Sequence, residues 1–167
     1  MTEIVCVSSV GKARATQEFA ANMLKEELEK DKKRVLVTRL SDPLKHICRN
    51  WFGWDGRPDD AGRSLLRYFG TNIVRARRPD FWVDFTLGLL SMVGDEWDFV
   101  IIPDCRYPNE FDLGRYGFRP RHVRLEEEGT PQYAHRLPTP DFTVVIGNTP
   151  GQLRRDMAAV AQGLVYG

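Results

Sequence analysis

The chain has 167 residues, of which 42% are hydrophobic and 28% charged, and this length and composition favour one globular domain over residues 1–167. Lysine and arginine (24) nearly balance aspartate and glutamate (23), so there is no overall signal for binding a nucleic acid polymer. The apolar runs are too short to cross a bilayer, and the N-terminus lacks a secretory pattern, which excludes a membrane protein and predicts a cytoplasmic one.

The first third of the chain has the pattern of a βαβ unit. Residues 3–9 form a short β-branched apolar run that breaks at Gly11, which predicts a buried strand entering a loop. Apolar residues then recur at helical spacing from Thr16 to Lys32, and a second predicted strand covers residues 34–40. Strand, helix and strand in this order predict a parallel sheet flanked by helices, an α/β fold in three layers.

Three helices are predicted next, over residues 43–51, 61–77 and 80–93. In the third, we expect Phe81, Trp82, Phe85 and Leu89 to share one buried face. Helix faces this rich in phenylalanine and tryptophan would also allow a homodimer.

A fully apolar run at 99–102 then predicts a central parallel strand, which delivers Asp104 at its carboxyl end, the edge where open α/β sheets bind ligands. A short helix near 109–116, a strand near 121–125, a proline-rich connection, a strand at 142–146 and a last helix at 151–164 complete the chain. Cys6, Cys48 and Cys105 lack metal-ligand spacing, so we predict buried free thiols.

The turn after the first strand occupies the place where such folds hold phosphate, because backbone amides and a helix N-terminus converge there. Its residues are Gly11, Lys12, Ala13, Arg14, Ala15, Thr16 and Gln17. A P-loop reads G-x-x-x-x-G-K-[ST], and counted from Gly11 this chain has Thr16 for the second glycine and Gln17 for the lysine. An ordinary strand-to-helix turn without phosphate is the alternative interpretation.

Several segments carry a more specific pattern. They are SDPLK at 41–45, GRSLLRYFGT at 62–71, Arg75, PDFWV at 79–83 and DCRYPNE at 104–110. In this order they resemble the deoxynucleoside monophosphate kinases of bacteriophages, which show DPLK, GR-x-LLQ-x-x-GT, PD-x-W and DVR-[FY]-PNE segments. The resemblance extends from the first predicted strand to the last helix, and DCRYPNE is its most specific part.

The resemblance implies a P-loop kinase fold that transfers the γ-phosphoryl group of ATP to a deoxynucleoside monophosphate with Mg²⁺. It implies a helical substrate-binding insertion at about 41–95 and a lid-like connection at about 126–141. Asp104 and Arg106 are the expected catalytic neighbours of substrate, with Asp104 also the metal ligand, whereas a helix cap and an ion pair are the alternative for both. The expected substrate-binding residues are Asp42, Lys45, Arg63, Arg67, Thr71, Arg75, Trp82, Asn109 and Glu110. For Trp82 and Thr71, packing and capping are the alternative.

The chain departs from the family pattern where the phosphate donor binds. Gln17 replaces the loop lysine, Phe19 replaces the hydroxyl residue that holds magnesium, and Arg67 replaces the glutamine of LLQ. Lys12 and Arg14 are the local cations that remain for catalysis. Two hypotheses follow: a kinase-like enzyme using ATP and Mg²⁺, and a catalytically inactive nucleotide-binding or sensing protein that keeps the monophosphate pocket.

Overall fold

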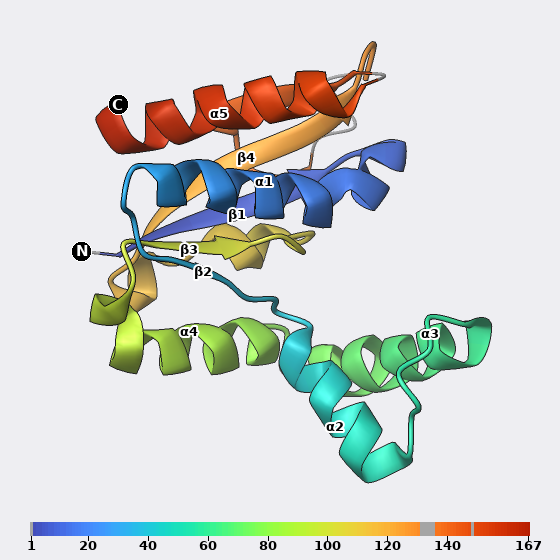
Figure 1. The fold of residues 1–167 in the computed structure, drawn as a ribbon. Coiled ribbons are helices and arrows are strands. Elements are labelled where there is room, and N and C mark those ends of the chain that lie inside the picture. Colours follow the sequence, from blue (N-terminus) through green and yellow to red (C-terminus); the bar gives the residue numbers. More distant parts are fainter. Residues whose placement is uncertain (1, 131–135, 148) are drawn as a thin grey trace.

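A computed structural model describes residues 2–130, 136–147 and 149–167 of the chain. Its centre is a sheet of five strands, all parallel, in the order β2-β3-β1-β4-β5 (Figure 1). The strands are β1 (Glu3–Ser9), β2 (Val35–Val37), β3 (Phe99–Ile102), β4 (Arg119–Glu127) and β5 (Phe142–Ile146). The β-branched and apolar runs form these strands because both faces of the sheet are covered by helices.

Helices lie on both faces of the sheet (Figure 1). One face carries α1 (Gln17–Lys30) and α5 (Pro150–Tyr166), packed on a core that includes Val5, Leu24 and Ile101. The other carries α4 (Phe81–Val93), packed on Ile4 and Val100. The α/β fold in three layers is therefore confirmed, and a parallel sheet flanked in this way fits a P-loop NTPase-like architecture.

The segment between β2 and α4 extends away from the sheet (Figure 1). It contains α2 (Asp42–Phe52), α3 (Asp60–Arg67) and η2 (Tyr68–Arg75), which is a π-helix that continues α3. Short 3₁₀-helices complete the fold: η1 (Gly11–Thr16), η3 (Gly94–Glu96), η4 (Pro108–Phe111) and η5 (Gly114–Tyr116). Of the predicted lid-like connection at about 126–141, Glu126 and Glu127 belong to β4, and residues 131–135 lie outside the described part of the chain.

One predicted face is wrong. Phe85 and Leu89 of α4 are exposed, whereas Val83, Leu87 and Leu90 are buried in the core under the sheet, and Trp82 is buried beside η2. The helix carries apolar residues on all sides, so periodicity alone does not tell which side faces the core.

Other predictions of elements differ in their limits. β2 ends at Val37 instead of residue 40, and the predicted helix at 109–116 is two separate 3₁₀ turns. The three cysteines are buried free thiols, as expected. Within the described residues, none of the helices has the length and hydropathy needed to span a bilayer.

Candidate functional site

A cavity of about 600 Å³ opens at the carboxyl edge of the sheet, and we call it the edge cavity. Its walls come from η1, from the segment after β3, and from the helical segment α2, α3 and η2. The lining residues are Arg14, Leu40, Ser41, Leu44, Lys45, Arg63, Leu66, Arg67, Gly70, Thr71, Arg75, Trp82, Asp104, Arg106, Tyr107 and Glu110. The position agrees with the rule that parallel α/β sheets bind ligands beyond the carboxyl ends of their strands.

Most of the predicted site residues meet in this cavity, although they come from segments up to about ninety residues apart. Arg14, Asp104 and Arg106 line it, together with Lys45, Arg63, Arg67, Thr71, Arg75, Trp82 and Glu110. Of the predicted catalytic and substrate-binding residues, three are absent from its lining: Lys12, Asp42 and Asn109; of the predicted phosphate loop at 11–17, Arg14 alone lines it.

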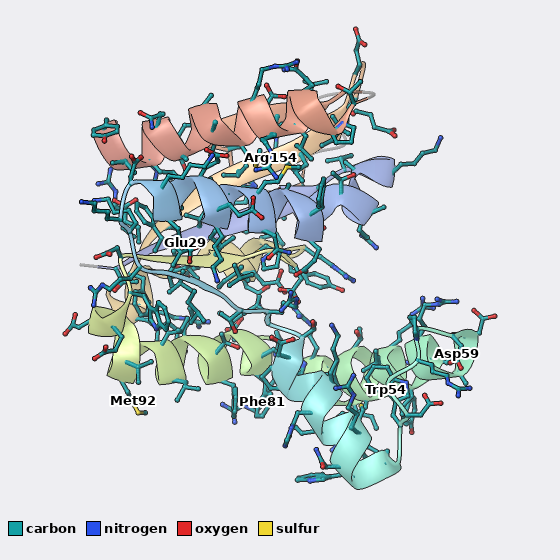
Figure 2. All side chains as sticks on the ribbon, viewed as in Figure 1. Glu29, Trp54, Asp59, Phe81, Met92 and Arg154 are labelled. Carbon is teal, nitrogen blue, oxygen red and sulfur yellow. The ribbon has the colours of Figure 1, made fainter. Side chains whose placement is uncertain are left out.

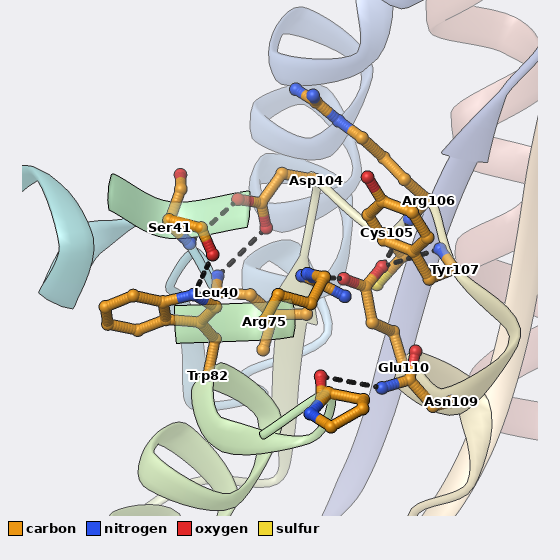
Figure 3. Close-up of polar contacts among 12 residues, drawn as sticks. Leu40, Ser41, Arg75, Trp82, Asp104, Cys105, Arg106, Tyr107, Asn109 and Glu110 are labelled. Atoms are coloured by element: carbon orange, nitrogen blue, oxygen red, sulfur yellow. Dashed lines mark hydrogen bonds and ion pairs between the residues drawn. The ribbon is translucent and has the colours of Figure 1, made fainter. Parts of the chain in front are cut away.

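Each of these three has another position. Lys12 is exposed on η1. The Asp42 carboxylate accepts a hydrogen bond from the Arg39 backbone amide at 3.2 Å. Asn109 donates through Nδ2 to Asp80 Oδ1 at 2.6 Å and to the Pro79 carbonyl at 3.2 Å, the second of which Figure 3 shows. Asp42 and Asn109 therefore stabilise turns beside the cavity.

The cavity wall after β3 is organised by the buried carboxylate of Glu110 (Figure 3). Glu110 Oε2 accepts hydrogen bonds from the backbone amides of Arg106 and Tyr107, and Oε1 pairs with Arg75 Nη2 at 3.0 Å. The Arg75 guanidinium also stacks over the Tyr107 ring at 4.1 Å. Burial raises the pKa of Glu110, while the two amides and Arg75 act in the opposite direction. Glu110 thus fixes both the turn and the arginine.

Asp104 holds the start of the helical segment (Figure 3). Its Oδ1 accepts a hydrogen bond from the Leu40 amide and its Oδ2 one from the Ser41 amide, each at 3.0 Å. Such bonds from a carboxylate to backbone amides are what the alternative interpretation of Asp104, as a helix cap, would produce. They join the end of β3 to the turn that precedes α2.

Hydrogen bonds already engage the acids of the cavity. All four carboxylate oxygens of Asp104 and Glu110 already accept hydrogen bonds. Within the described residues, no three or more histidine, cysteine, aspartate or glutamate side chains are grouped to hold a metal ion. Magnesium is typically held by one or two carboxylates together with substrate phosphates, so a metal here would depend on the ligand's own oxygens.

The cations of the cavity are less fully paired than the acids. Arg75 pairs with Glu110, and Arg63 pairs with the exposed Asp60 at 2.6 Å. Over residues 2–130, 136–147 and 149–167, four other lining cations make no ion pair: Arg14, Lys45, Arg67 and Arg106. A concave site with unpaired positive charges attracts an anion, and arginine is suited to bidentate binding of phosphate or carboxylate.

Trp82 and Gly70 form the apolar floor. Trp82 is buried, and its Nε1 donates to the Gly70 carbonyl at 3.2 Å, so this tryptophan joins α4 to η2. A Cβ at position 70 would collide with the Leu44 side chain, and the glycine therefore lets η2 approach α2 closely. Sequence reasoning missed six cavity residues: Leu40, Ser41, Leu44, Leu66, Gly70 and Tyr107. All but Leu40 lie within the SDPLK, GRSLLRYFGT and DCRYPNE segments that pointed to their neighbours.

The turn after β1 differs from a phosphate cradle. Gln17, at the position of the P-loop lysine, is buried; its Nε2 donates to the Val7 carbonyl at 2.8 Å, and its Oε1 accepts from Ser9 Oγ at 2.9 Å. Residues 11–16 form a 3₁₀-helix, whose amides bond to carbonyls three residues back. Gly11 has a φ of +63°, and a Cβ there would lie 3.4 Å from Glu127 Oε2. The turn therefore lacks the lysine that a P-loop brings to the phosphates, and Gln17 in its place is hydrogen-bonded within the fold.

Comparisons with known proteins identify no family. No family model matches the chain, and neither does any curated protein. Among solved structures, the Mycobacterium tuberculosis APS kinase CysC is 15% identical, with a TM-score of 0.47, over 98% of this chain and 94% of that one. A hexameric APS kinase from Thiobacillus denitrificans is 15% identical, with a TM-score of 0.49, over 97% of this chain and 29% of that one. Such distant likenesses carry no information on substrate, which must be sought in the residues of the edge cavity.

Proposed function

We propose that the chain is a nucleotide-kinase-like protein that binds a nucleoside monophosphate in the edge cavity. The observation that carries the proposal is the presence of four unpaired cations around one cavity whose acids are all hydrogen-bonded. A phosphate monoester supplies about two negative charges at neutral pH, which these cations would balance.

The rest of the cavity offers a place for the nucleoside. Leu44, Leu66 and Trp82 provide apolar lining next to the cations, a combination typical of sites that bury an aromatic ring while fixing a charged group. The resemblance to deoxynucleoside monophosphate kinases favours a deoxynucleotide, since the matching segments supply most of these lining residues.

Thermal unfolding of the chain with each nucleoside monophosphate, with the matching nucleoside and with inorganic phosphate tests the proposal. A ligand at a hundred times its dissociation constant stabilises the folded state by about 2.7 kcal/mol, which is a readily measured shift of the melting temperature. We expect a shift with at least one monophosphate, a smaller one with phosphate and none with the nucleoside. No shift with any monophosphate at millimolar concentration would contradict the proposal.

Phosphoryl transfer from ATP is the second candidate function. The observation that favours it is Arg14, which lies in the turn after β1 and yet lines the same cavity as Arg106. An arginine there would supply a cation near a transferred phosphoryl group. ATP with Mg²⁺ should then raise the melting temperature further when a monophosphate is already bound, and a coupled assay should detect ADP. Stabilisation by the monophosphate alone would support binding without transfer.

A further inference from the structure

The outer face of α4 is apolar and uncovered. Phe85 is 51% exposed, Leu89 55%, Met92 80% and Val93 42%, and we call these four residues the α4 stripe. Their spacing of four, three and one residues places them on one side of the helix, opposite the buried Val83 and Leu87. In Figure 2, α4 lies along one side of the molecule with Met92 and Phe81 directed away from the sheet. Contiguous apolar surface of this kind marks an interaction site.

Gly88 lies on the same side of the helix, near the middle of the stripe. Glycine is a poor residue for a helix interior because it loses the most backbone freedom on folding. Nothing among the described residues lies within 4 Å of the place its Cβ would occupy, so no contact within the chain explains the glycine. A residue without a side chain at this point would let the backbone of another helix approach closely.

The two ends of the stripe carry opposite charges. Before α4 come Arg77 and Arg78, both exposed, with the Arg78 guanidinium 5.6 Å from the Phe81 ring centre. After it come Asp95 and Glu96 of η3, also exposed, whereas the nearby Arg34 pairs with Asp98 at 3.2 Å. Asp80 and Asp84, which lie at the first end, pair with Arg115 at 3.2 and 3.0 Å. The exposed arginines at one end and the exposed acids at the other therefore make this face complementary to itself turned by 180°.

We propose that the chain forms a two-fold symmetric dimer in which the α4 stripes of two copies pack antiparallel. The two helices cross near Gly88, Phe85 of one copy contacts Met92 of the other, and Arg78 faces the partner copy's Glu96. An isologous contact of this kind closes on itself and produces a dimer, not a fibre. It is separate from the edge cavity, because none of the four residues of the α4 stripe lines that cavity.

The expected dimer is weak. The helix has 13 residues and is about 20 Å long, so a contact confined to it buries less than the roughly 800 Å² per partner of a standard interface. Sedimentation velocity over a range from micromolar to near-millimolar chain concentration should therefore show reversible association, from the 19.2 kDa chain towards twice that mass. A single-chain mass throughout the range overturns the proposal. This result would also be found if the α4 stripe binds a different protein instead of a second copy of the chain.

Two variants test which surface is used. Met92→Glu should shift the dissociation constant upward at least tenfold, because it places a carboxylate in the apolar contact. Trp51→Glu is the matched control: Trp51 is 74% exposed but lies on α2, outside the stripe, and its replacement should leave the association unchanged. The proposal is overturned if Met92→Glu leaves the dimer intact, whatever the effect of Trp51→Glu. Circular dichroism verifies that each variant is folded.

A charge exchange tests the antiparallel arrangement itself. Arg78→Glu and Glu96→Arg should each weaken the dimer several-fold, and the double variant should restore it, since each copy then presents the reversed pair. No recovery in the double variant overturns the antiparallel pairing. Gly88→Met gives a second readout: no described atom lies within 4 Å of the place of its Cβ, so the monomer should fold while the dimer is lost.

Discussion

The segments that follow β1 and β3 leave the same edge of the sheet, yet they differ in the charged side chains that they place there. After β3, Glu110 and Asp104 are satisfied by backbone amides and Arg75, and Arg106 remains unpaired beside the cavity. After β1, the position of the P-loop lysine holds a neutral glutamine bonded to the strand itself. One segment thus supports anion binding, while the other has become a structural connection.

The largest effect, on the free energy of unfolding, is expected from removing Glu110, the acid that organises the segment after β3. Glu110→Ala leaves Arg75 and two backbone amides without their partner in a buried place, and breaking such a buried pair costs roughly 3–5 kcal/mol. Urea unfolding measures the loss. Glu29→Ala, which removes an exposed carboxylate 3.6 Å from Lys25, is the control and should cost less than about 1 kcal/mol. Equal effects of the two substitutions would mean that Glu110 does not organise the turn.

A buried histidine of β4, His122, contacts β1, and its protonation should change the stability of the fold. His122 Nε2 lies 2.7 Å from Ser8 Oγ, and burial, followed by the nearby Arg124, lowers the pKa of His122 from 6.5 to about 4. A depressed folded-state pKa means that the unfolded chain binds the proton first. Stability is therefore complete above pH 6.5 and decreases as the pH falls towards 4, by roughly 3 kcal/mol.

Urea unfolding at a series of pH values between 7 and 4 measures this dependence. His122→Gln removes the titrating group and should flatten the curve over that range, while lowering stability at neutral pH. A variant whose stability still falls as steeply between pH 6.5 and 4 would show that other groups cause the effect.

Ligand affinity tests the unpaired cations directly. Arg67→Ala and Arg106→Ala should each weaken monophosphate binding by roughly ten- to a hundred-fold, because a hydrogen bond to a charged group contributes about 1.5–3 kcal/mol. Isothermal titration calorimetry gives the dissociation constants. Arg155→Ala, an exposed arginine on α5 that bonds Gln152, should leave them unchanged. Similar losses in all three variants would point to general charge attraction in place of a defined site.

The smallest effect is expected in the turn after β1. Gln17→Ala removes the partner of the Val7 carbonyl and the Ser9 hydroxyl and should cost roughly 1–2 kcal/mol in urea unfolding without changing monophosphate affinity. Gln162→Ala, an exposed glutamine on α5, is the control. If Gln17→Ala left stability intact and altered nucleotide affinity instead, the turn would be part of the binding site after all.

Local pattern was sufficient for the elements and for the edge where the ligand site lies. The apolar runs at 3–9 and 99–102 became β1 and β3, and the segments SDPLK, GRSLLRYFGT and DCRYPNE supplied most of the cavity lining. The strands follow from periodicity, and the edge follows from the rule that parallel strands deliver their following residues to one side, whereas the three segments were singled out by their resemblance to phage deoxynucleoside monophosphate kinases. Residue types therefore predicted a cationic site before the shape of the cavity was known.

The sequence by itself determined the parallel α/β architecture, because it follows from short-range pattern and strand direction, whereas the cations of the cavity were expected from the resemblance of their segments to a kinase family. Only the tertiary structure decided which charges are neutralised, since Arg75 and Glu110 lie 35 residues apart and meet through packing. It also decided that Gln17 points into the fold, and that Phe85 and Leu89 face outward from a helix apolar on every side. Pairing and orientation depend on contacts between distant segments, and no local pattern encodes them.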